Sequence, residues 1–190
     1  MSLRFVRPED GPALLAIYAQ YIHTPITFEY ELPSQEEFDR RIREFSGFYP
    51  YLVWEETGTI LGYAYAHRQF ERAAYQWNVE VTVYLDEAAC GKGLGTRLHR
   101  AVLDLLRLQG IKSAYAYIIA ANAPSRRMCE AMGYTLAATF PSTGYKADGW
   151  QDMCWYLIFL NGFEPAPQPP ISVQDLAPNL VQQVLQKAEA

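Results

Sequence analysis

The stretch 79–96, VEVTVYLDEAACGKGLGT, decides the fold of this chain. Apolar and polar residues alternate over 79–86, which is the period of a β-strand. Apolar residues then recur at helical spacing over 98–105. A glycine-rich turn joins the two segments and contains Gly91, Gly93 and Gly95. The stretch therefore predicts a strand, a tight turn and an amphipathic helix in direct succession.

Such a turn favours binding of an anion. Its backbone N–H groups point outward, and the positive end of the following helix attracts a pyrophosphate. The segment 91–96 fits neither the P-loop pattern nor the dinucleotide pattern G-x-G-x-x-G. We expect a nucleotide-like cofactor held by Gly91, Lys92, Gly93, Leu94, Gly95 and Thr96.

A second block, NAPSRRMCEAMGY at 122–134, has the features of a short capped helix. Asn122 follows a predicted strand, where its amide can bond an amide of the cofactor. Pro124 suits the first turn of a helix, and Gly133 suits the left-handed position at its end.

Together the two blocks resemble motifs A and B of the GCN5-related N-acetyltransferases, the GNAT superfamily. Motif A is written Arg/Gln-x-x-Gly-x-Gly/Ala, and motif B contains Asn-x-x-Ser and then Gly-Phe/Tyr. The resemblance implies that acetyl-coenzyme A is the cofactor and that Asn122 and Ser125 contact it. It also implies that the strand residues Val83, Tyr84 and Leu85 pair with pantetheine. Two positions depart from the pattern: Cys90 replaces Arg or Gln, and Cys129 replaces a Tyr that can protonate the departing thiolate.

Composition sets the class of protein. The 190 residues are half apolar and 19% charged, enough for one well-packed domain. The net charge of -5 and the lack of long Lys/Arg clusters argue against nucleic-acid binding. The three cysteines and three histidines show no metal-ligand spacing, so we expect no metal. With neither a signal peptide nor a membrane anchor apparent, we expect a cytoplasmic protein.

Periodicity along the chain predicts an α+β protein. The expected strands are 3–7, 51–55, 59–67, 79–86, 113–119, 135–140 and 152–160. The expected helices are 8–22, 35–45 with a Ser34/Glu37 capping box, one after the glycine turn and one in the second block. This order matches the GNAT fold, a mixed, mostly antiparallel sheet flanked by helices.

Three segments make up the chain. We expect the acetyltransferase domain over 1–161 and a proline-rich linker over 162–170. An amphipathic helix is expected over 171–190, with a Ser172/Asp175 box at its start. Its apolar stripe favours packing on its own domain or on a second subunit over a separate partner.

Within the superfamily, residues 1–160 resemble the phosphinothricin and methionine sulfoximine acetyltransferases. The resemblance is carried by 21–38, 49–56, 62–85 and 144–160, most specifically by Arg-Ala-Ala-Tyr, then Trp, then Val-Glu-x-Thr-Val-Tyr. It implies acetylation of the α-amino group of a small amino acid or analogue, often in a homodimer.

Glu80 is the expected general base. A free α-amine has a pKa of about 7.7 to 8, so a base must remove its proton before it attacks a thioester. Glu80 lies in mid-strand on the polar phase of the alternation and can act directly or through a water. An outward-facing surface carboxylate is the alternative.

The acceptor's acidic group requires a cation, for which Arg72 is the candidate and Arg68 the reserve. Surface solvation is the alternative for both. The resemblance further implies that Phe28, Tyr75 and Trp77 line the acceptor pocket. Acyl transfer is expected to be direct, within a ternary complex.

Two other functions stay open. The same fold can acetylate a polyamine, an antibiotic or a protein N-terminus. A coenzyme A-binding module without turnover is the second alternative, which the departures at Cys90 and Cys129 keep open.

Overall fold

One seven-stranded sheet organises the computed structural model, which describes residues 2–190. The strands are β1 (Ser2–Phe5), β2 (Tyr51–Glu56), β3 (Thr59–Arg68), β4 (Asn78–Leu85), β5 (Ser113–Ile119), β6 (Thr135–Lys146) and β7 (Gly149–Phe159). Their order across the sheet is β1-β2-β3-β4-β5-β7-β6, and β4–β5 is the only parallel pair within residues 2–190. The mixed, mostly antiparallel sheet expected from the sequence is confirmed.

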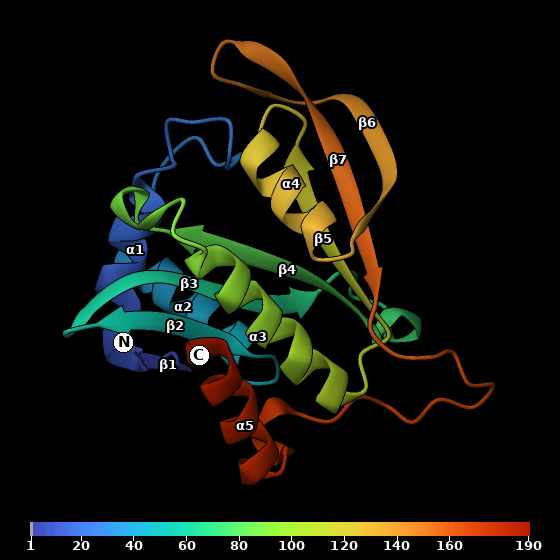
Figure 1. Ribbon diagram of the computed structural model, residues 1–190. Coiled ribbons are helices and arrows are strands. Elements are labelled where there is room, and N and C mark those ends of the chain that lie inside the picture. The colour runs from blue at the N-terminus through green and yellow to red at the C-terminus, as the bar shows by residue number, and fades with distance from the viewer. Residues whose placement is uncertain (1) are drawn as a thin grey trace.

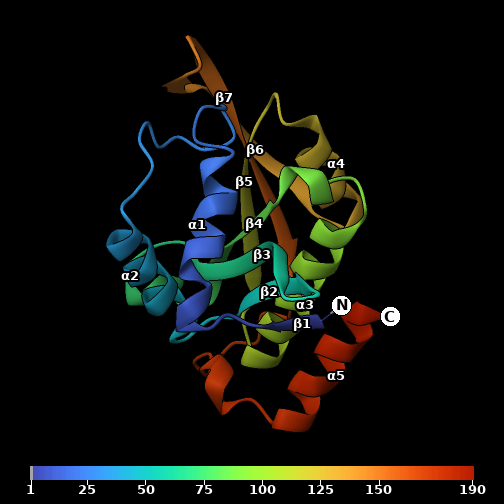
Figure 2. The same ribbon diagram turned by 90° about the vertical axis from the view of Figure 1, so that its left-hand side faces the viewer.

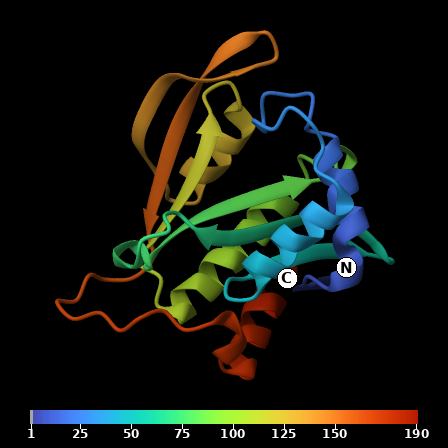
Figure 3. The same ribbon diagram turned by 180° about the vertical axis from the view of Figure 1, so that it is seen from behind.

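Helices cover both faces of the sheet. The structure has α1 (Gly11–Ala19), α2 (Gln35–Ser46), α3 (Leu94–Gln109), α4 (Ala123–Ala131) and α5 (Pro178–Glu189). Short 3-10 turns lie at Pro8–Asp10, Ala73–Tyr75, Glu87–Ala89 and Val173–Asp175. In Figure 1, α3 and α4 lie in front of the strands, and Figure 3 shows α1 and α2 on the opposite face. None of the helices in residues 2–190 is both long and apolar enough to cross a membrane.

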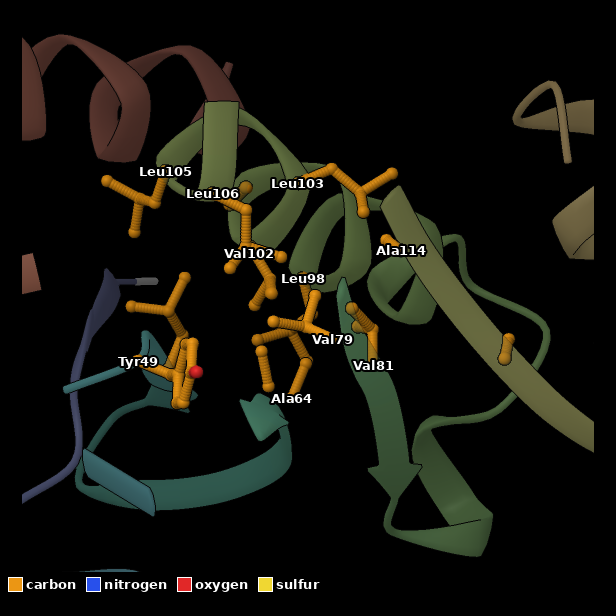
Figure 4. Close-up of a cluster of buried hydrophobic side chains, with 14 of the residues drawn as sticks. Tyr49, Ala64, Val79, Val81, Leu98, Val102, Leu103, Leu105, Leu106 and Ala114 are labelled. Atoms are coloured by element: carbon orange, nitrogen blue, oxygen red, sulfur yellow. The ribbon is translucent and has the colours of Figure 1, made fainter. Parts of the chain in front are cut away.

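The amphipathic helix α3 packs on the centre of the sheet. Its buried side chains point from the helix toward β3, β4 and β5 (Figure 4). Leu98, Val102 and Leu105 are fully buried, as their helical spacing predicts. Each such side chain contributes about 1.5–3 kcal/mol on burial. This packing fixes the position of the glycine-rich turn at the start of α3.

Parallel pairing between β4 and β5 ends almost as soon as it begins. Only Asn78–Glu80 and Ser113–Tyr115 are in register, and the two strands then diverge. On its other edge β4 stays paired with β3 up to Leu85. Figure 3 shows the resulting V between the two halves of the sheet. Beyond Glu80, the backbone of β4 is therefore unpaired on the edge that faces β5.

The β6–β7 hairpin is longer than the sequence predicts. The expected strands 135–140 and 152–160 are observed as Thr135–Lys146 and Gly149–Phe159. Pro141 lies within a register shift between Phe140 and Gly144, so its missing N–H donor interrupts no ladder pair and the strand continues past it. Ala147 and Asp148 close the hairpin with positive φ values of 51° and 59°.

Smaller differences occur at the first strand and helix. The expected strand 3–7 is observed as Ser2–Phe5. The expected helix 8–22 begins with a 3-10 turn and ends at Ala19, although Ile22 is buried as expected. In the second helix, Ser34 accepts a hydrogen bond from Glu37 N, as the capping box predicts.

The C-terminal helix begins later than the sequence predicts. Ser172 caps only a 3-10 turn, because Leu176 is buried in an extended conformation and the helix restarts at Pro178. The apolar face of α5 packs on the main core. Figure 2 shows the helix beside α3 and β1. Glu189 accepts a hydrogen bond from Leu3 N at 2.7 Å, which ties the end of the chain to β1.

Candidate active site

The turn between β4 and α3 has the backbone geometry of an anion site. Gly91 and Gly93 have φ values of +76° and +81°, and Gly93 occupies the N-cap position of α3. The N–H groups of the first turn have no carbonyl partner inside the helix, and no side chain caps them. These N–H groups are available to a pyrophosphate.

At Gly95, the start of α3 lies close to the end of β4 and to α4. A Cβ atom on Gly95 would lie 3.4 Å from Leu85 Cδ1 and 3.5 Å from Met128 Sδ. A larger side chain at this position would push α3 away from both neighbours or block the space between them. The helix start, the end of β4 and α4 therefore meet closely at this glycine.

A cavity of about 440 Å³ lies beside the turn, between α3, the end of β4 and the start of α4. Most of the residues predicted to bind the cofactor line it: Val83, Tyr84, Leu85, Gly91, Gly93, Gly95, Thr96, Asn122 and Ser125. Of the other two, Lys92 is exposed on the turn and Leu94 is buried in the core. The cavity is thus bounded by the turn and by the diverging strands.

A narrower cavity of about 70 Å³ lies between the diverging strands. It shares Val83, Asn122 and Met128 with the larger one and extends to Val81 and Ala116, near the point where the strands part. His99 and Cys129 also line it. An extended ligand can therefore run from the glycine turn toward the base of the V.

The open edge of β4 offers hydrogen bonds to such a ligand. Asp86 N donates to Leu61 O on the β3 side. Because N–H directions alternate along a strand, those of Val81 and Val83 face the β5 side, where pairing has ended. An extended amide chain can add here as a further strand.

Asn122 caps the helix α4 with its amide oxygen. Its Oδ1 accepts a hydrogen bond from Ser125 N at 3.3 Å. The amide oxygen of Asn122, which the sequence analysis assigned with the rest of the amide to the cofactor, therefore already has a partner within the protein. The helix starts with Pro124 in its first turn and ends before Gly133, whose φ is +95°. Both helix-boundary predictions are confirmed.

Glu80 lies where β4 and β5 separate. It is the last β4 residue paired with β5, and it sits opposite His67 on β3 and Tyr115 on β5. Its side chain is 21% exposed, and its Oε2 lies 3.5 Å from His67 Nε2. Burial raises the pKa of Glu80 to about 7, whereas burial lowers the pKa of His67. At neutral pH the imidazole is uncharged, so the pair is not an ion pair and Glu80 can accept a proton.

Polar and aromatic side chains surround Glu80 on the same face. Gln69, the residue after β3, donates from its Nε2 to Tyr117 Oη at 2.8 Å and so links the end of β3 to β5. Burial is the main cause that raises the pKa of Tyr117 to about 12, and the Glu80 charge adds to it. Tyr117 stacks on Trp155 with ring centroids 4.3 Å apart. The sequence analysis missed these neighbours, although the pairing of His67 with Glu80 follows from two adjacent antiparallel strands.

The predicted acceptor residues are spread over several elements. Arg72 is exposed just before the turn Ala73–Tyr75, and Tyr75 packs against Phe70 at 4.9 Å between centroids. Trp77 Nε1 donates to Gln168 O in the proline-rich segment. None of these side chains lines the cavities between β4 and β5.

The remaining two candidates also lie away from those cavities. Phe28 packs over Gly144 of the β6–β7 hairpin, and a Cβ atom there would lie 2.7 Å from Phe28 Cε2. The reserve cation, Arg68, is exposed and donates to Glu71 O at 3.3 Å. Their role in acceptor binding stays a prediction.

Metal and cysteine chemistry find no support in the part of the chain that the structure describes. No group of three or more His, Cys, Asp or Glu side chains in residues 2–190 could hold a metal ion. Burial raises the pKa of Cys129 to about 12, so its thiol stays protonated at neutral pH. Cys90 is exposed at the turn as a free thiol.

Replacement of Glu80 by Gln is expected to change how stability depends on pH. Because the folded-state pKa of Glu80 is raised, the folded protein binds its proton more tightly than the unfolded chain does. Wild-type stability therefore falls as the pH rises from about 4.5 to 7. The neutral amide removes this loss, so Glu80→Gln should gain stability relative to wild type, on the order of 2 kcal/mol, between about pH 4 and pH 8.

Urea unfolding of both proteins across this range measures the difference. Glu36→Gln, at an exposed position on α2, is the matched control and should follow wild type. Parallel pH profiles for Glu80→Gln and wild type would show that the carboxyl is not desolvated.

Comparison with known proteins agrees with the fold. Residues 3–155 match the family described as acetyltransferase (GNAT) domain. A phosphinothricin N-acetyltransferase of Streptomyces viridochromogenes is 36% identical over 90% of this chain and 93% of its own length. An L-methionine sulfoximine/L-methionine sulfone acetyltransferase of Pseudomonas aeruginosa is 32% identical over 87% of this chain and 98% of its own.

A solved structure shows the same architecture. The GNAT superfamily phosphinothricin acetyltransferase from Sinorhizobium meliloti, crystallised in complex with AcCoA, superposes with a TM-score of 0.85. It is 30% identical, and the match covers 92% of this chain and 97% of that one.

Proposed function

We propose that this chain, which belongs to the GNAT family and is an acetyl-CoA-dependent N-acetyltransferase, acetylates the α-amino group of a small amino acid or a close analogue. The observation that carries the proposal is the position of Glu80 at the base of the V, where its pKa lies near neutrality. Relatives that act on phosphinothricin and on methionine sulfoximine support the class of acceptor.

The residues around the two cavities fit acetyl-CoA. The N–H groups at the start of α3 suit the pyrophosphate, and the unpaired edge of β4 suits the two amides of pantetheine. When bound, acetyl-CoA supplies an activated acetyl group as a thioester. Val81 or Val83 can donate its N–H to the thioester carbonyl and stabilise the negative charge that develops there.

Glu80 prepares the acceptor for attack. Because the pKa of Glu80 is near 7, a substantial fraction of it is ionised at neutral pH and can take a proton from the acceptor's ammonium group. The free amine then attacks the thioester carbon directly. Transfer through Cys129 is disfavoured, since its thiol is buried and protonated.

Acceptor binding involves the face of the sheet that carries Glu80. His67, Gln69 and Tyr117 lie near the carboxyl and supply polar atoms, and Tyr117 stacks on Trp155. From outside the two cavities, Arg72, with Arg68 in reserve, is the proposed cation for the acceptor's acidic group, and Phe28, Tyr75 and Trp77 are the proposed apolar walls. A site of this composition favours a small zwitterion over a polyamine, which would need an excess of carboxylates.

A panel of acceptors tests the assignment. Release of free coenzyme A from acetyl-CoA should be fastest with phosphinothricin, methionine sulfoximine or a related amino acid. Polyamines, an aminoglycoside and an N-terminal peptide should react at least tenfold more slowly. A preference for one of these amines would replace the proposed acceptor, and tight acetyl-CoA binding with no turnover on any acceptor would favour a non-catalytic module.

Glu80→Gln should remove the base without disturbing the cofactor. We expect kcat near neutral pH to fall on the order of a hundredfold, with acetyl-CoA affinity changed by less than about threefold. The acidic limb of the wild-type profile of kcat/KM should disappear. If Glu80→Gln retains wild-type kcat and the same limb, another group is the base. Glu36→Gln again serves as the control.

We also propose a homodimer, in which the β6–β7 hairpin contributes to the interface. Trp150 and Phe159 on this hairpin are 66% and 63% exposed, which is unusual for large apolar side chains. Light scattering should give about twice the chain mass of 21.7 kDa, and Trp150→Asp should shift the protein toward the monomer. A monomeric mass for wild type would refute the homodimer.

A further inference from the structure

Glu80 and His67 form a pair of hydrogen-bond acceptors at the base of the V. They lie opposite each other on β4 and β3, with Glu80 Oε2 3.5 Å from His67 Nε2. Their side chains are 21% and 26% exposed, so a ligand atom can reach both. The chemistry of the two atoms decides what kind of ligand group fits beside them.

The backbone fixes the tautomer of His67. Its Nδ1 lies 2.8 Å from the carbonyl oxygen of Arg68, which can only accept a hydrogen bond. Burial lowers the pKa of His67, so at neutral pH the ring is uncharged and carries one proton. That proton lies on Nδ1, because a proton on Nε2 would leave two lone pairs facing each other at 2.8 Å. His67 Nε2 is therefore an acceptor.

Neither acceptor has a donor within residues 2–190. No N–H or O–H group donates a hydrogen bond to the Glu80 carboxylate, and burial is the only cause of its raised pKa. His67 Nε2 likewise has no donor. An ionised carboxylate and a bare ring nitrogen 3.5 Å apart repel each other. A donor that lies beside both atoms removes this repulsion.

A third acceptor lies across the V on β5. Because side chains alternate along a strand, Tyr117 is on the same face of the sheet as Tyr115, which is opposite Glu80. Tyr117 is partly exposed and lines the narrow cavity between the strands. Its ring stacks on Trp155, and its Oη contacts Gln69 Nε2. These contacts hold the hydroxyl in place beside the point where the strands part.

The Tyr117 hydroxyl keeps a free lone pair in either orientation of the Gln69 amide. A phenol oxygen has two lone pairs and one hydrogen. If it accepts from Nε2, one lone pair stays free, and if the amide is turned and the hydroxyl donates to Oε1, both do. Burial is the main cause that raises the pKa of Tyr117 to about 12, so the oxygen stays neutral. Tyr117 is therefore available as an acceptor.

An ammonium group is complementary to these three acceptors. It has three N–H donors, and its positive charge offsets the negative charge of ionised Glu80. A carboxylate, a phosphinate or a thioester oxygen would instead add a further acceptor to the site. The three atoms therefore indicate a primary amine in its protonated form, which is the main state of an α-amine at neutral pH.

We propose that His67 and Tyr117 are further catalytic residues, which accept two N–H groups of the substrate's ammonium while Glu80 accepts the third. This inference rests on the proposed acetyltransferase function.

His67 and Tyr117 neither gain nor lose a proton in the reaction. Glu80 takes one proton from the ammonium group, which leaves an amine with two N–H groups and one lone pair. The two N–H groups stay bonded to His67 and Tyr117, which restricts the directions open to the lone pair. The lone pair forms the bond to the acetyl carbon, and the electron pair of the carbon–sulfur bond moves onto sulfur. The nitrogen then loses a second proton to solvent, and water protonates the departing thiolate.

The affinities for an amino acid and for its deamino analogue test this site without turnover. The analogue carries hydrogen in place of the α-amino group. The pair is phosphinothricin and its analogue, or the corresponding pair for whichever amino acid reacts fastest in the acceptor panel. Calorimetry with coenzyme A bound should show that wild type prefers the amino acid. In His67→Phe and in Tyr117→Phe this preference should fall at least fivefold, with the affinities for the analogue and for acetyl-CoA changed by less than threefold.

Further variants separate the hydrogen bonds from packing. Both substitutions keep an aromatic ring for the stacking partner, and each carries the test if the other does not fold. His67→Gln, which keeps a side-chain acceptor, should retain part of the preference. His23→Phe and Tyr145→Phe, at exposed positions, are the matched controls and should behave as wild type. In turnover, kcat/KM for the amino acid should fall about ten- to a hundredfold in His67→Phe and in Tyr117→Phe.

The possible failures of the inference and of the proposed function differ. An unchanged preference in one variant would remove that residue from the site. An equal loss of affinity for the amino acid and its analogue, or no preference in wild type, would overturn the ammonium site as a whole. If no amino acid in the panel reacts, the proposed function fails, and the inference fails with it.

Discussion

The early end of pairing between β4 and β5 is the constraint on which the site depends. Both strands are held at their start by three residue pairs, and β4 is held along its other edge by β3. Past Glu80 the two strands diverge, and the backbone of β4 keeps an unpaired edge. Buried unpaired N–H groups are costly, so this edge is stable only if it faces water or a ligand with complementary amides. The cavities lie along it.

Packing of α3 converts this opening into a cofactor site. The apolar face of the helix fixes it across β3, β4 and β5 (Figure 4), and its first turn lies beside the end of β4. Gly95 lies at this approach, where a Cβ atom would be in ordinary van der Waals contact with Leu85 and Met128. The same packing buries His99 beside the narrow cavity. One helix therefore supplies both the anion site and part of the wall of the narrow cavity.

The pKa of Glu80 is raised because its carboxyl is buried and no positive charge lies beside it. The carboxyl sits opposite His67, but burial keeps that imidazole neutral, so no cation lowers the pKa of Glu80. A paired arginine in the same place would have lowered the pKa and made a weaker base. The same partly closed, aromatic-lined face of the sheet thus raises the pKa of the proposed base and forms the proposed acceptor site.

The sequence by itself determined the strand–turn–helix unit and indicated the family, because these follow from local periodicity, glycine conformation and motif spacing. It also indicated Glu80 from its phase in the strand. Only the tertiary structure decided that Trp77 bonds to Gln168, that α5 starts at Pro178 and that β6 continues past Pro141. It alone placed His99 on α3 beside Tyr134, the residue before β6. These outcomes depend on contacts between residues far apart in the chain, which local patterns do not encode.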